Sequence, residues 1–366
     1  MSDAVSSRTR TPPAADGRVL EELGCYLLAG QPASSREIVT EAADAERLGL
    51  GTAYISERYN RKEAASLSGA AGAVTERITI ATGATNHNTR HPMVTAGYAR
   101  TMQSLTGGRF VLGLGRGVTI LQDVYGIPHI TTAQMEDFVE IMRRLFRGEA
   151  IVGHQGAAGS WPVLHLDSSL DEHLPMGIMA FGPNTLELGG RCFDEVVLHT
   201  FFTDETTARC VRTVKAAAER AGRDPDSVKV WSCFATIGDH IPEDKRLMKL
   251  VGRLGTYLQG YGHLLARTNE WDVAVVDRFL ADPVIAAVGS GLDMVGTPEQ
   301  LEHAASLIPD EWLAPAATGT AAQCVAAVRN QLDLGCDGVI MHGATPAELA
   351  PIIEEYRSTY AGRNSP

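Results

Sequence analysis

The chain has 366 residues, of which 44% are hydrophobic and 21% are charged, the composition of a globular protein with a large buried core. Its formal net charge of -12 argues against nucleic acid or an anionic membrane surface as the main partner, so we expect a small-molecule substrate. The six cysteines are scattered without a CxxC pair, and no stretch resembles a secretory signal or reaches membrane-spanning length, so we expect a cytoplasmic protein with free thiols.

Residues 1–20 are polar, and we expect them to form a disordered leader before a single domain that covers residues 21–362. Within that domain, short apolar runs alternate with segments of helical period, which is the pattern of folds built from βα units. Ser34 and Glu37 have the spacing of a capping box, which predicts that the first helix begins there.

Eight apolar runs have the length and composition of strands. The predicted strands, with their turns, are residues 24–30, 52–57, 77–84, 107–117, 174–181, 194–200, 227–237 and 336–343. The predicted helices are residues 34–49, 63–77, 92–105, 131–148, 183–191 and 204–222, with a last helix opened by Thr345, Pro346 and Glu348. Residues 149–172 look irregular. Eight alternating units predict an α/β fold, a (β/α)8 TIM barrel, with a doubly wound sheet as the alternative.

About eighty residues, 238–318, separate the seventh predicted strand from the eighth, and this is too many for one βα turn. They are rich in Leu, Gly and Tyr, so we expect a helical insertion in the barrel. Long structured loops at the active face of a barrel commonly gate access to the site. We therefore expect the insertion to be a mobile cover over the barrel mouth.

The active site of a parallel barrel is built from the loops that follow the C-terminal ends of the strands. This rule selects the candidate residues before any motif is considered. They are Ser56, Glu57 and Arg58; Ala84, Thr85, Asn86 and His87; Gly115, Arg116 and Gly117; Ala180, Phe181, Gly182, Pro183 and Asn184; His199 and Thr200; and Met341, His342 and Gly343.

Two of these exits are rich in small residues. The sequence GLGRG at residues 113–117 matches a dinucleotide fingerprint poorly, because its third glycine comes too early and three βα units precede it. It is either a tight turn at the barrel rim or a ligand contact, and Arg116 favours the ligand. The sequence AFGPN at residues 180–184 is either a phosphate site at a helix start or an ordinary turn.

His87 and His91 have the spacing of two metal ligands on one helix. Pro92 disfavours helical geometry at His91, so the two rings need not converge, and we expect no metal. The chain also lacks a GxSxG elbow, a Walker A loop and an HExxH motif. These absences favour an enzyme whose cofactor carries the difficult chemistry.

Residues 77–117, RITIATGATNHNTRHPMVTAGYARTMQSLTGGRFVLGLGRG, closely resemble the hallmark segment of the bacterial-luciferase-like superfamily. In that segment a strand, an RHP helix and a GGRF strand follow in this order. Weaker resemblance extends through ISER at residues 55–58 and through residues 180–198, so it covers about residues 23 to 360. The resemblance implies a (β/α)8 barrel that binds FMN or the deazaflavin coenzyme F420, and the Ala- and Gly-rich, lysine-poor sequence favours F420.

The same resemblance implies where the cofactor lies. Its ring would lie over Ala84, Thr85 and Asn86, where the family often has a bulge with a non-proline cis peptide. The ribityl-phosphate side would be held by Gly115, Arg116 and Gly117 and by Ala180, Phe181, Gly182, Pro183 and Asn184. Arg58 and Val118 stand where the glucose-6-phosphate enzymes of the family carry a catalytic histidine and glutamate, so that reaction is not expected.

We therefore expect an oxidoreductase that transfers a hydride between F420 and a small organic substrate, as a homodimer. The alternatives are an FMN-dependent monooxygenase of the luciferase type, a metal-dependent barrel hydrolase and a non-catalytic flavin-binding barrel. The candidate catalytic residues are Glu57, Arg58 and His87. Arg58 stays protonated and can stabilise negative charge on a reduced ring. Glu57 is favoured as the base over His87, although a salt bridge to a neighbouring arginine is an equal alternative for Glu57.

Overall fold

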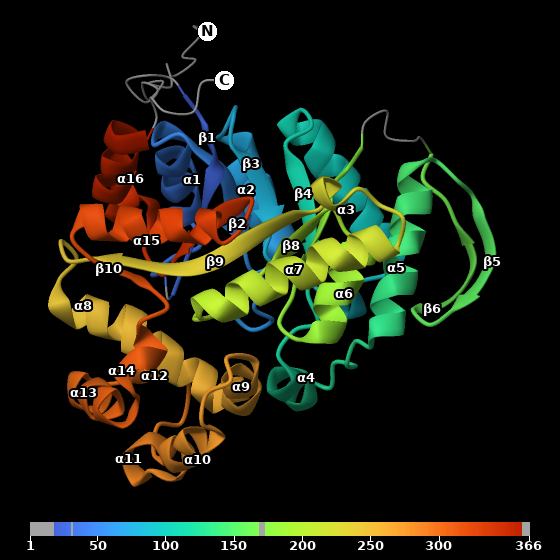
Figure 1. Ribbon diagram of the computed structural model, residues 1–366. Coiled ribbons are helices and arrows are strands. Elements are labelled where there is room, and N and C mark those ends of the chain that lie inside the picture. Colours follow the sequence, from blue (N-terminus) through green and yellow to red (C-terminus); the bar gives the residue numbers. More distant parts are fainter. Residues whose placement is uncertain (1–17, 31, 168–172, 361–366) are drawn as a thin grey trace, which may run out of the picture.

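The computed structural model describes residues 18–30, 32–167 and 173–360. Most of the predicted leader, residues 1–17, lies outside the described residues. Parallel strands close into a barrel with helices around its outside, as Figure 1 shows. The predicted barrel is therefore confirmed, and the doubly wound alternative is wrong because β8 pairs with β9 and leaves no open edge in the ring.

The barrel follows the order β9, β11, β1, β2, β3, β4, β7, β8 and back to β9, and every pairing in this ring is parallel. The short strand β10 (Ala317–Gly319) pairs with β9 outside the ring. The barrel strands are β1 (Leu20–Tyr26), β2 (Leu50–Ile55), β3 (Thr79–Thr82), β4 (Phe110–Leu114), β7 (Met176–Met179), β8 (Glu195–Val197), β9 (Lys229–Gly238) and β11 (Gly338–His342).

Helices follow the strands as the sequence predicts, and two further helices, at residues 119–125 and 321–333, were not predicted. The helices that alternate with the strands are α1 (Glu37–Arg47), α2 (Ala64–Ala73), α3 (Pro92–Thr106), α4 (Thr119–Tyr125), α5 (Thr132–Phe146), α6 (Pro183–Cys192), α7 (Asp204–Arg220), α15 (Ala321–Asp333) and α16 (Pro346–Tyr360). A capping box at Thr345 and Glu348 opens α16, as expected. The capping box predicted at Ser34 is wrong, because α1 begins at Glu37 and Arg36 is its N-cap without a side-chain bond.

The segment between β9 and β10 is helical, as predicted. It contains α8 (Glu243–Leu247), a π-helical turn (Met248–Gly252), α9 (Arg253–Thr268), α10 (Val273–Ala281), α11 (Pro283–Ala286), α12 (Leu292–Val295), α13 (Pro298–Leu307) and α14 (Asp310–Leu313). Figure 1 shows these helices gathered at the lower end of the barrel, where α4 also lies. This is the end at which the parallel strands finish, so we call it the barrel mouth.

The structure corrects the prediction that residues 149–172 are irregular, of which residues 168–172 lie outside the described residues. Strands β5 (Ile151–Gly156) and β6 (Gly159–Leu164) form an antiparallel hairpin beside α5. Asp137 of α5 holds the hairpin, since its carboxylate bonds His154 at 3.1 Å and the backbone N–H of Ala158 at 2.8 Å. Most of the hairpin is exposed, so its sequence lacks the apolar alternation that would reveal a strand.

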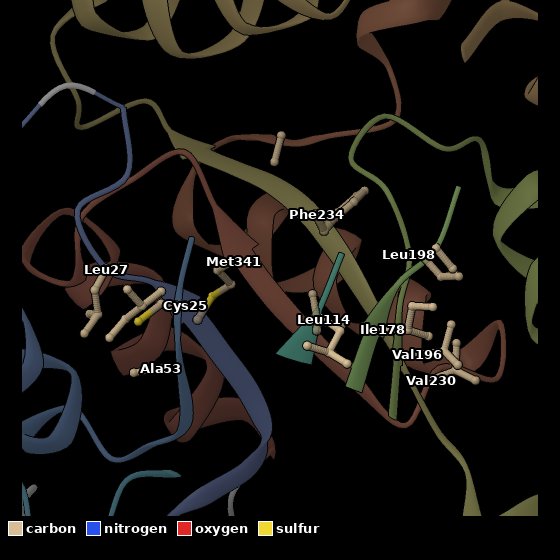
Figure 2. Close-up of a cluster of buried hydrophobic side chains, with 14 of the residues drawn as sticks. Cys25, Leu27, Ala53, Leu114, Ile178, Val196, Leu198, Val230, Phe234 and Met341 are labelled. Atoms are coloured by element: carbon tan, nitrogen blue, oxygen red, sulfur yellow. The ribbon is translucent and has the colours of Figure 1, made fainter. Parts of the chain in front are cut away.

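Alternate side chains of the barrel strands face two cores. Tyr26, Tyr54 and Trp231 belong to the smaller inner core, and their rings lie 5.7 and 5.9 Å apart. Neighbours of opposite orientation, such as Cys25 and Ala53, join the larger core between strands and helices. Figure 2 shows part of that larger core, with labelled residues from seven barrel strands.

At the end opposite the mouth, α16 packs beside the start of β1. The hydroxyl of Tyr356 donates to Glu22 at 2.9 Å, and the guanidinium of Arg357 donates to the carbonyls of Arg18 and Leu48 at 2.8 Å. In the parts of the chain that the structure describes, no helix is both long enough and apolar enough to cross a membrane.

Candidate active site

The exit of β3 is bent around a cis peptide between Gly83 and Ala84, as the resemblance implied. Backbone bonds fix both sides of this bend: Gly83 N–H donates to Ile55 of β2 at 2.8 Å, and Thr85 N–H donates to Gly113 of β4 at 2.9 Å. The carbonyl of Ala84 accepts from the N–H of Glu57 at 3.0 Å. The bend is thus held between its two neighbouring strands.

Glycines in β4 let this bend approach closely. A Cβ atom on Gly115 would lie 2.8 Å from the Cβ of Ala84, and a Cβ on Gly113 would collide with the carbonyl oxygen of Thr82. The side-chain amide of Asn86 donates to the carbonyl of Gly115 at 2.7 Å. Three predicted cofactor residues, Ala84, Thr85 and Asn86, therefore lie directly against Gly115. We call these four residues the cradle.

The guanidinium of Arg90 donates to both carboxylate oxygens of Glu57, at 3.0 and 2.9 Å. Thr85 donates its hydroxyl to the same carboxylate, and Arg90 also bonds that hydroxyl at 2.7 Å. Only 7% of the Glu57 side chain and 15% of the Arg90 side chain are exposed. This geometry favours the salt-bridge alternative for Glu57, and the role of Glu57 as a base stays a prediction.

His87 lies beside the cradle in sequence but turns away from it. Its ring stacks on Phe138 of α5 with centroids 4.6 Å apart, in the wall of a cavity of about 250 Å³. Burial lowers the pKa of His87 to about 4, so the ring is neutral near pH 7. His91 caps α3, because its Nδ1 accepts from Met93 N–H at 3.2 Å. Among the described residues, no group of three or more His, Cys, Asp or Glu side chains could hold a metal ion.

Arg116 and Gly117 follow β4. The guanidinium of Arg116 donates to the carbonyl of Ile130 at 3.3 Å and to the hydroxyl of Thr132 at 2.8 Å. Arg116 therefore ties the β4 exit to the start of α5, and the proposed ligand contact of its side chain stays untested. Gly117 is exposed with φ of 80°, a conformation that favours glycine.

The β7 exit contains the other predicted cofactor residues. Gly182 is the N-cap of α6 without a side-chain bond, and Pro183 is the first helical residue, followed by the exposed Asn184. Ala180 is buried and pairs with Val197 through its N–H at 2.9 Å. The N–H groups of Thr185 and Leu186 both bond the Gly182 carbonyl, at 3.0 and 3.1 Å, so what α6 offers an anion beside the β7 exit is mainly the positive end of its dipole.

Phe181 belongs to an aromatic cluster that the sequence did not predict. Its ring lies 4.4 Å from His199 of the β8 exit and 5.6 Å from Tyr261 of α9, measured between centroids. His199 Nδ1 must donate to the Thr200 carbonyl at 2.9 Å, so in the neutral ring Nε2 accepts from the Tyr261 hydroxyl at 3.1 Å. Burial lowers the pKa of His199 to about 4, which keeps the ring neutral.

The insertion also contributes charge to the mouth. Arg253 of α9 pairs with Asp293 of α12 at 2.7 Å, and their side chains are only 7% and 4% exposed. Lys62, after β2, donates to the carbonyl of Leu28 at 3.0 Å, and burial together with the nearby Arg58 lowers its pKa to about 8. Arg253, Asp293 and Lys62 were missed because no motif marks them. The only available signal was their place in or near predicted mouth segments.

Comparison with known families identifies relatives. The family model for luciferase-like monooxygenases matches residues 19–338. Two curated 5,10-methylenetetrahydromethanopterin reductases, from Methanolobus tindarius and Methanopyrus kandleri, are 29% and 27% identical over 197 and 222 residues. The alignments cover 52% and 56% of this chain and 59% and 62% of those relatives. The chain thus spans about three fifths of the length of these two relatives.

Solved structures share the fold over nearly the whole chain. The coenzyme F420 dependent tetrahydromethanopterin reductase from Methanopyrus kandleri has a TM-score of 0.78 at 19% identity, covering 94% of this chain and 99% of that one. An F420-dependent secondary alcohol dehydrogenase in complex with an F420-acetone adduct has a TM-score of 0.69 at 17% identity, covering 91% and 97%. The monooxygenase RslO1 from Streptomyces bottropensis has a TM-score of 0.65 at 19% identity, covering 94% and 100%.

Proposed function

Because this chain belongs to the luciferase-like monooxygenase family, we propose that it is an oxidoreductase that transfers a hydride between coenzyme F420 and a small organic substrate. The deazaflavin supplies the hydride chemistry when it is bound. The chain supplies the position, the exclusion of water and the charges around the ring. The observation that carries the proposal is the cradle, where β3 and β4 approach through residues without large side chains.

The cradle fits a flat ring better than it fits an extended side chain or a metal. Ala84 and Gly115 offer no bulk at the surface of the bend, and any Cβ at Gly115 would meet Ala84 at 2.8 Å. The Asn86 amide is fixed to Gly115, so the surface is set before a ligand arrives. A preformed surface of this kind lowers the entropic cost of binding.

F420 is favoured over FMN by the relatives. The two solved structures with the highest TM-scores given above are both of F420-dependent enzymes. The α6 N-terminus, as the positive end of a helix dipole, suits the phosphate that both cofactors carry, so this feature does not separate them. The choice of F420 therefore rests on the relatives and on the composition of the chain.

Within this proposal, the aromatic cluster excludes water from the mouth and contains a neutral hydrogen bond. The Tyr261 hydroxyl is a hydrogen-bond donor whose proton points at His199 Nε2, and both side chains lie at the mouth. Burial lowers the pKa of His199 to about 4 and raises the pKa of Tyr261 well above its usual value, so near pH 7 the proton stays on the Tyr261 hydroxyl and the pair is a neutral hydrogen bond. Phe181 and Tyr257 pack against His199 and shield it from water.

The test compares the two cofactors directly. The purified protein is titrated with F420 and with FMN, and quenching of cofactor fluorescence gives the two affinities. We expect F420 to bind at least about tenfold tighter, which equals about 1.4 kcal/mol. Gly115→Ala should weaken F420 binding by about tenfold, because the added methyl collides with Ala84 and closes the cradle.

Gly97→Ala is the matched control, because Gly97 lies in α3 outside the cradle and an added methyl there would meet no atom within 4 Å. It should leave both affinities unchanged. Tighter binding of FMN would point to a flavin-dependent monooxygenase instead. Equal binding of F420 by the Gly115→Ala variant would show that the cofactor does not use the cradle.

A further inference from the structure

A short turn after β2 places two cations side by side. Arg58 and Lys62 form an antiparallel bridge in which each backbone N–H donates to the carbonyl of the other at 3.0 Å. Directly opposed residues of such a pair extend their side chains on the same side. The turn therefore presents both positive side chains to one region, although like charges in this arrangement destabilise the fold.

Arg58 has no direct carboxylate partner among the residues that the structure describes. Among the described residues, the Arg58 guanidinium has no hydrogen bond or ion pair. Its pKa is lowered mainly by burial and by the charge of Arg253, and the charge of Asp293 opposes this shift only in part. Within the described parts of the chain, Lys62 bonds the carbonyl of Leu28 at 3.0 Å and forms no ion pair with a carboxylate. The nearest acidic groups are committed elsewhere, since Glu41 accepts from Leu28 N–H at 2.6 Å and Asp293 is paired with Arg253.

These cations follow the strand next to the cradle, since β2 pairs with β3 and Glu57 N–H bonds the Ala84 carbonyl, and they extend toward the exits of β1 and β11. Arg58 and Lys62 follow β2, Lys62 reaches the exit of β1, and the charges of both lower the pKa of His342 at the end of β11. The strands β11, β1 and β2 are neighbours in the ring, whereas the predicted cofactor residues follow β3, β4 and β7. At the mouth, the cations Arg58 and Lys62 therefore lie near the exits of β11, β1 and β2, and the predicted cofactor residues lie at the adjoining exits of β3, β4 and β7.

We propose that Arg58 and Lys62 form a binding site for the acidic group of the substrate, so that the substrate is a carboxylate or another oxyanion. A planar guanidinium and an adjacent ammonium match an oxyanion, which would restore the missing negative charge. Tyr26 and His342, whose rings lie 5.2 Å apart, provide an aromatic wall beside the site. This inference rests on the proposed function for the reaction, but the anion site itself is testable without turnover.

The experiment uses benzoate as the probe and benzamide as its neutral counterpart of the same shape, with affinities from isothermal titration calorimetry. We expect benzoate to bind the wild-type protein at least about tenfold tighter than benzamide, as for a charge-assisted contact. Arg58→Gln should abolish this preference, and Lys62→Gln should reduce it. Arg61→Gln is the matched control, because Arg61 is the exposed cation at the tip of the same turn and should leave the preference intact.

A second measurement guards against misfolding. Removing one of two opposed like charges should raise the melting temperature of Arg58→Gln by about 1 to 2 °C. A folded Arg58→Gln variant that still prefers benzoate would overturn the proposal, and so would equal binding of benzoate and benzamide by the wild type.

The last arm separates the substrate from the cofactor as the source of the anion. Benzoate is titrated again in the presence of saturating F420, and we expect its affinity to change by less than about threefold. Expulsion of benzoate by F420 would assign Arg58 to the cofactor and overturn the proposal. Failure of F420 to bind at all, with the benzoate preference intact, would refute the proposed function and leave the anion site standing.

Discussion

At the scale of single residues, the best-defined feature is the ion pair between Glu57 and Arg90. Its two parallel bonds join the β2 exit to the loop before α3, and the same carboxylate accepts from Thr85 of the cradle. Glu57 N–H also holds the Ala84 carbonyl. Glu57 is therefore placed to fix the shape of the bend at β3, whether or not it also handles a proton.

Glu57→Gln should destabilise the protein by about 2 to 3 kcal/mol, because it leaves the nearly buried Arg90 with only the half-exposed Glu63 as a charged partner. Urea unfolding measures this loss. Glu136→Gln is the control, since Glu136 makes a similar two-oxygen pair with Arg191 on the surface and should cost less than about 1 kcal/mol. Equal losses in both variants would contradict the structural role. An unchanged rate and pH profile of Glu57→Gln would reject Glu57 as the base.

At the scale of elements, the contact between β3 and β4 decides the geometry of the cradle. The hydroxyl of Thr82 donates to the Gly113 carbonyl and accepts from the Gly113 N–H, both at 2.8 Å. This reciprocal pair binds the last residue of β3 to the middle of β4. Any side chain at position 113 would push the two strands apart.

Gly113→Ala should therefore lower the free energy of unfolding by about 3 kcal/mol, because the colliding atom is a backbone oxygen that cannot rotate away. Gly97→Ala, in the interior of α3 with open space around it, should instead raise stability by about 0.5 to 1 kcal/mol. Chemical denaturation of both variants measures these changes in the free energy of unfolding. A Gly113→Ala variant as stable as the wild type would show that the strands can separate without cost.

The sequence predicted elements better than it predicted contacts. Strong periodicity revealed the eight barrel strands, whereas the exposed hairpin β5–β6 and the three-residue β10 had no such signal. In the site, the resemblance identified the bend at Gly83 and Ala84, since a local motif encodes it. The pairs Arg253 with Asp293 and His199 with Tyr261 could not be predicted, because they depend on how the insertion docks on the barrel.

At the scale of the whole molecule, the insertion and the barrel share one core. Leu254 and Leu258 of α9 are buried in the same hydrophobic cluster as the barrel strands. Lys249 donates to the carbonyl of Gly343 at 2.8 Å, and Asn269 donates to that of Phe201 at 2.8 Å. Mobility of the insertion as a cover stays a prediction, and these contacts indicate that its inner helices are integral to the fold.

Buried titratable groups make the stability of the molecule depend on pH. Burial lowers the pKa of His87 and His199 to about 4 and that of His342 well below its usual value, whereas burial raises the pKa of Glu195 to about 7. Between pH 4.5 and 6.5 the unfolded chain binds more protons at the histidines, and the folded chain binds more at Glu195. The three histidines outweigh the single carboxyl, so stability should fall as the pH is lowered through this window.

His87→Phe keeps the stack on Phe138 and removes one titrating group, so it should reduce this dependence by up to about 1.4 kcal/mol per pH unit. The free energy of unfolding at several pH values between 4.5 and 6.5 measures the slope. His165→Gln, at an exposed position, is the control and should keep the wild-type slope. The same slope in His87→Phe as in the wild type would show that His87 is not buried and neutral.

The packing of α16 beside β1 also makes the chain suitable for circular permutation. Arg357 bonds the Arg18 carbonyl at the end opposite the mouth, so a short peptide could join these two regions without crossing the site. New ends could open at the exposed hairpin tip, between Gly156 and Gly159. The rearranged polypeptide would begin at β6 and finish at β5, with every barrel pairing kept. It would also free the end opposite the mouth for attachment to a support.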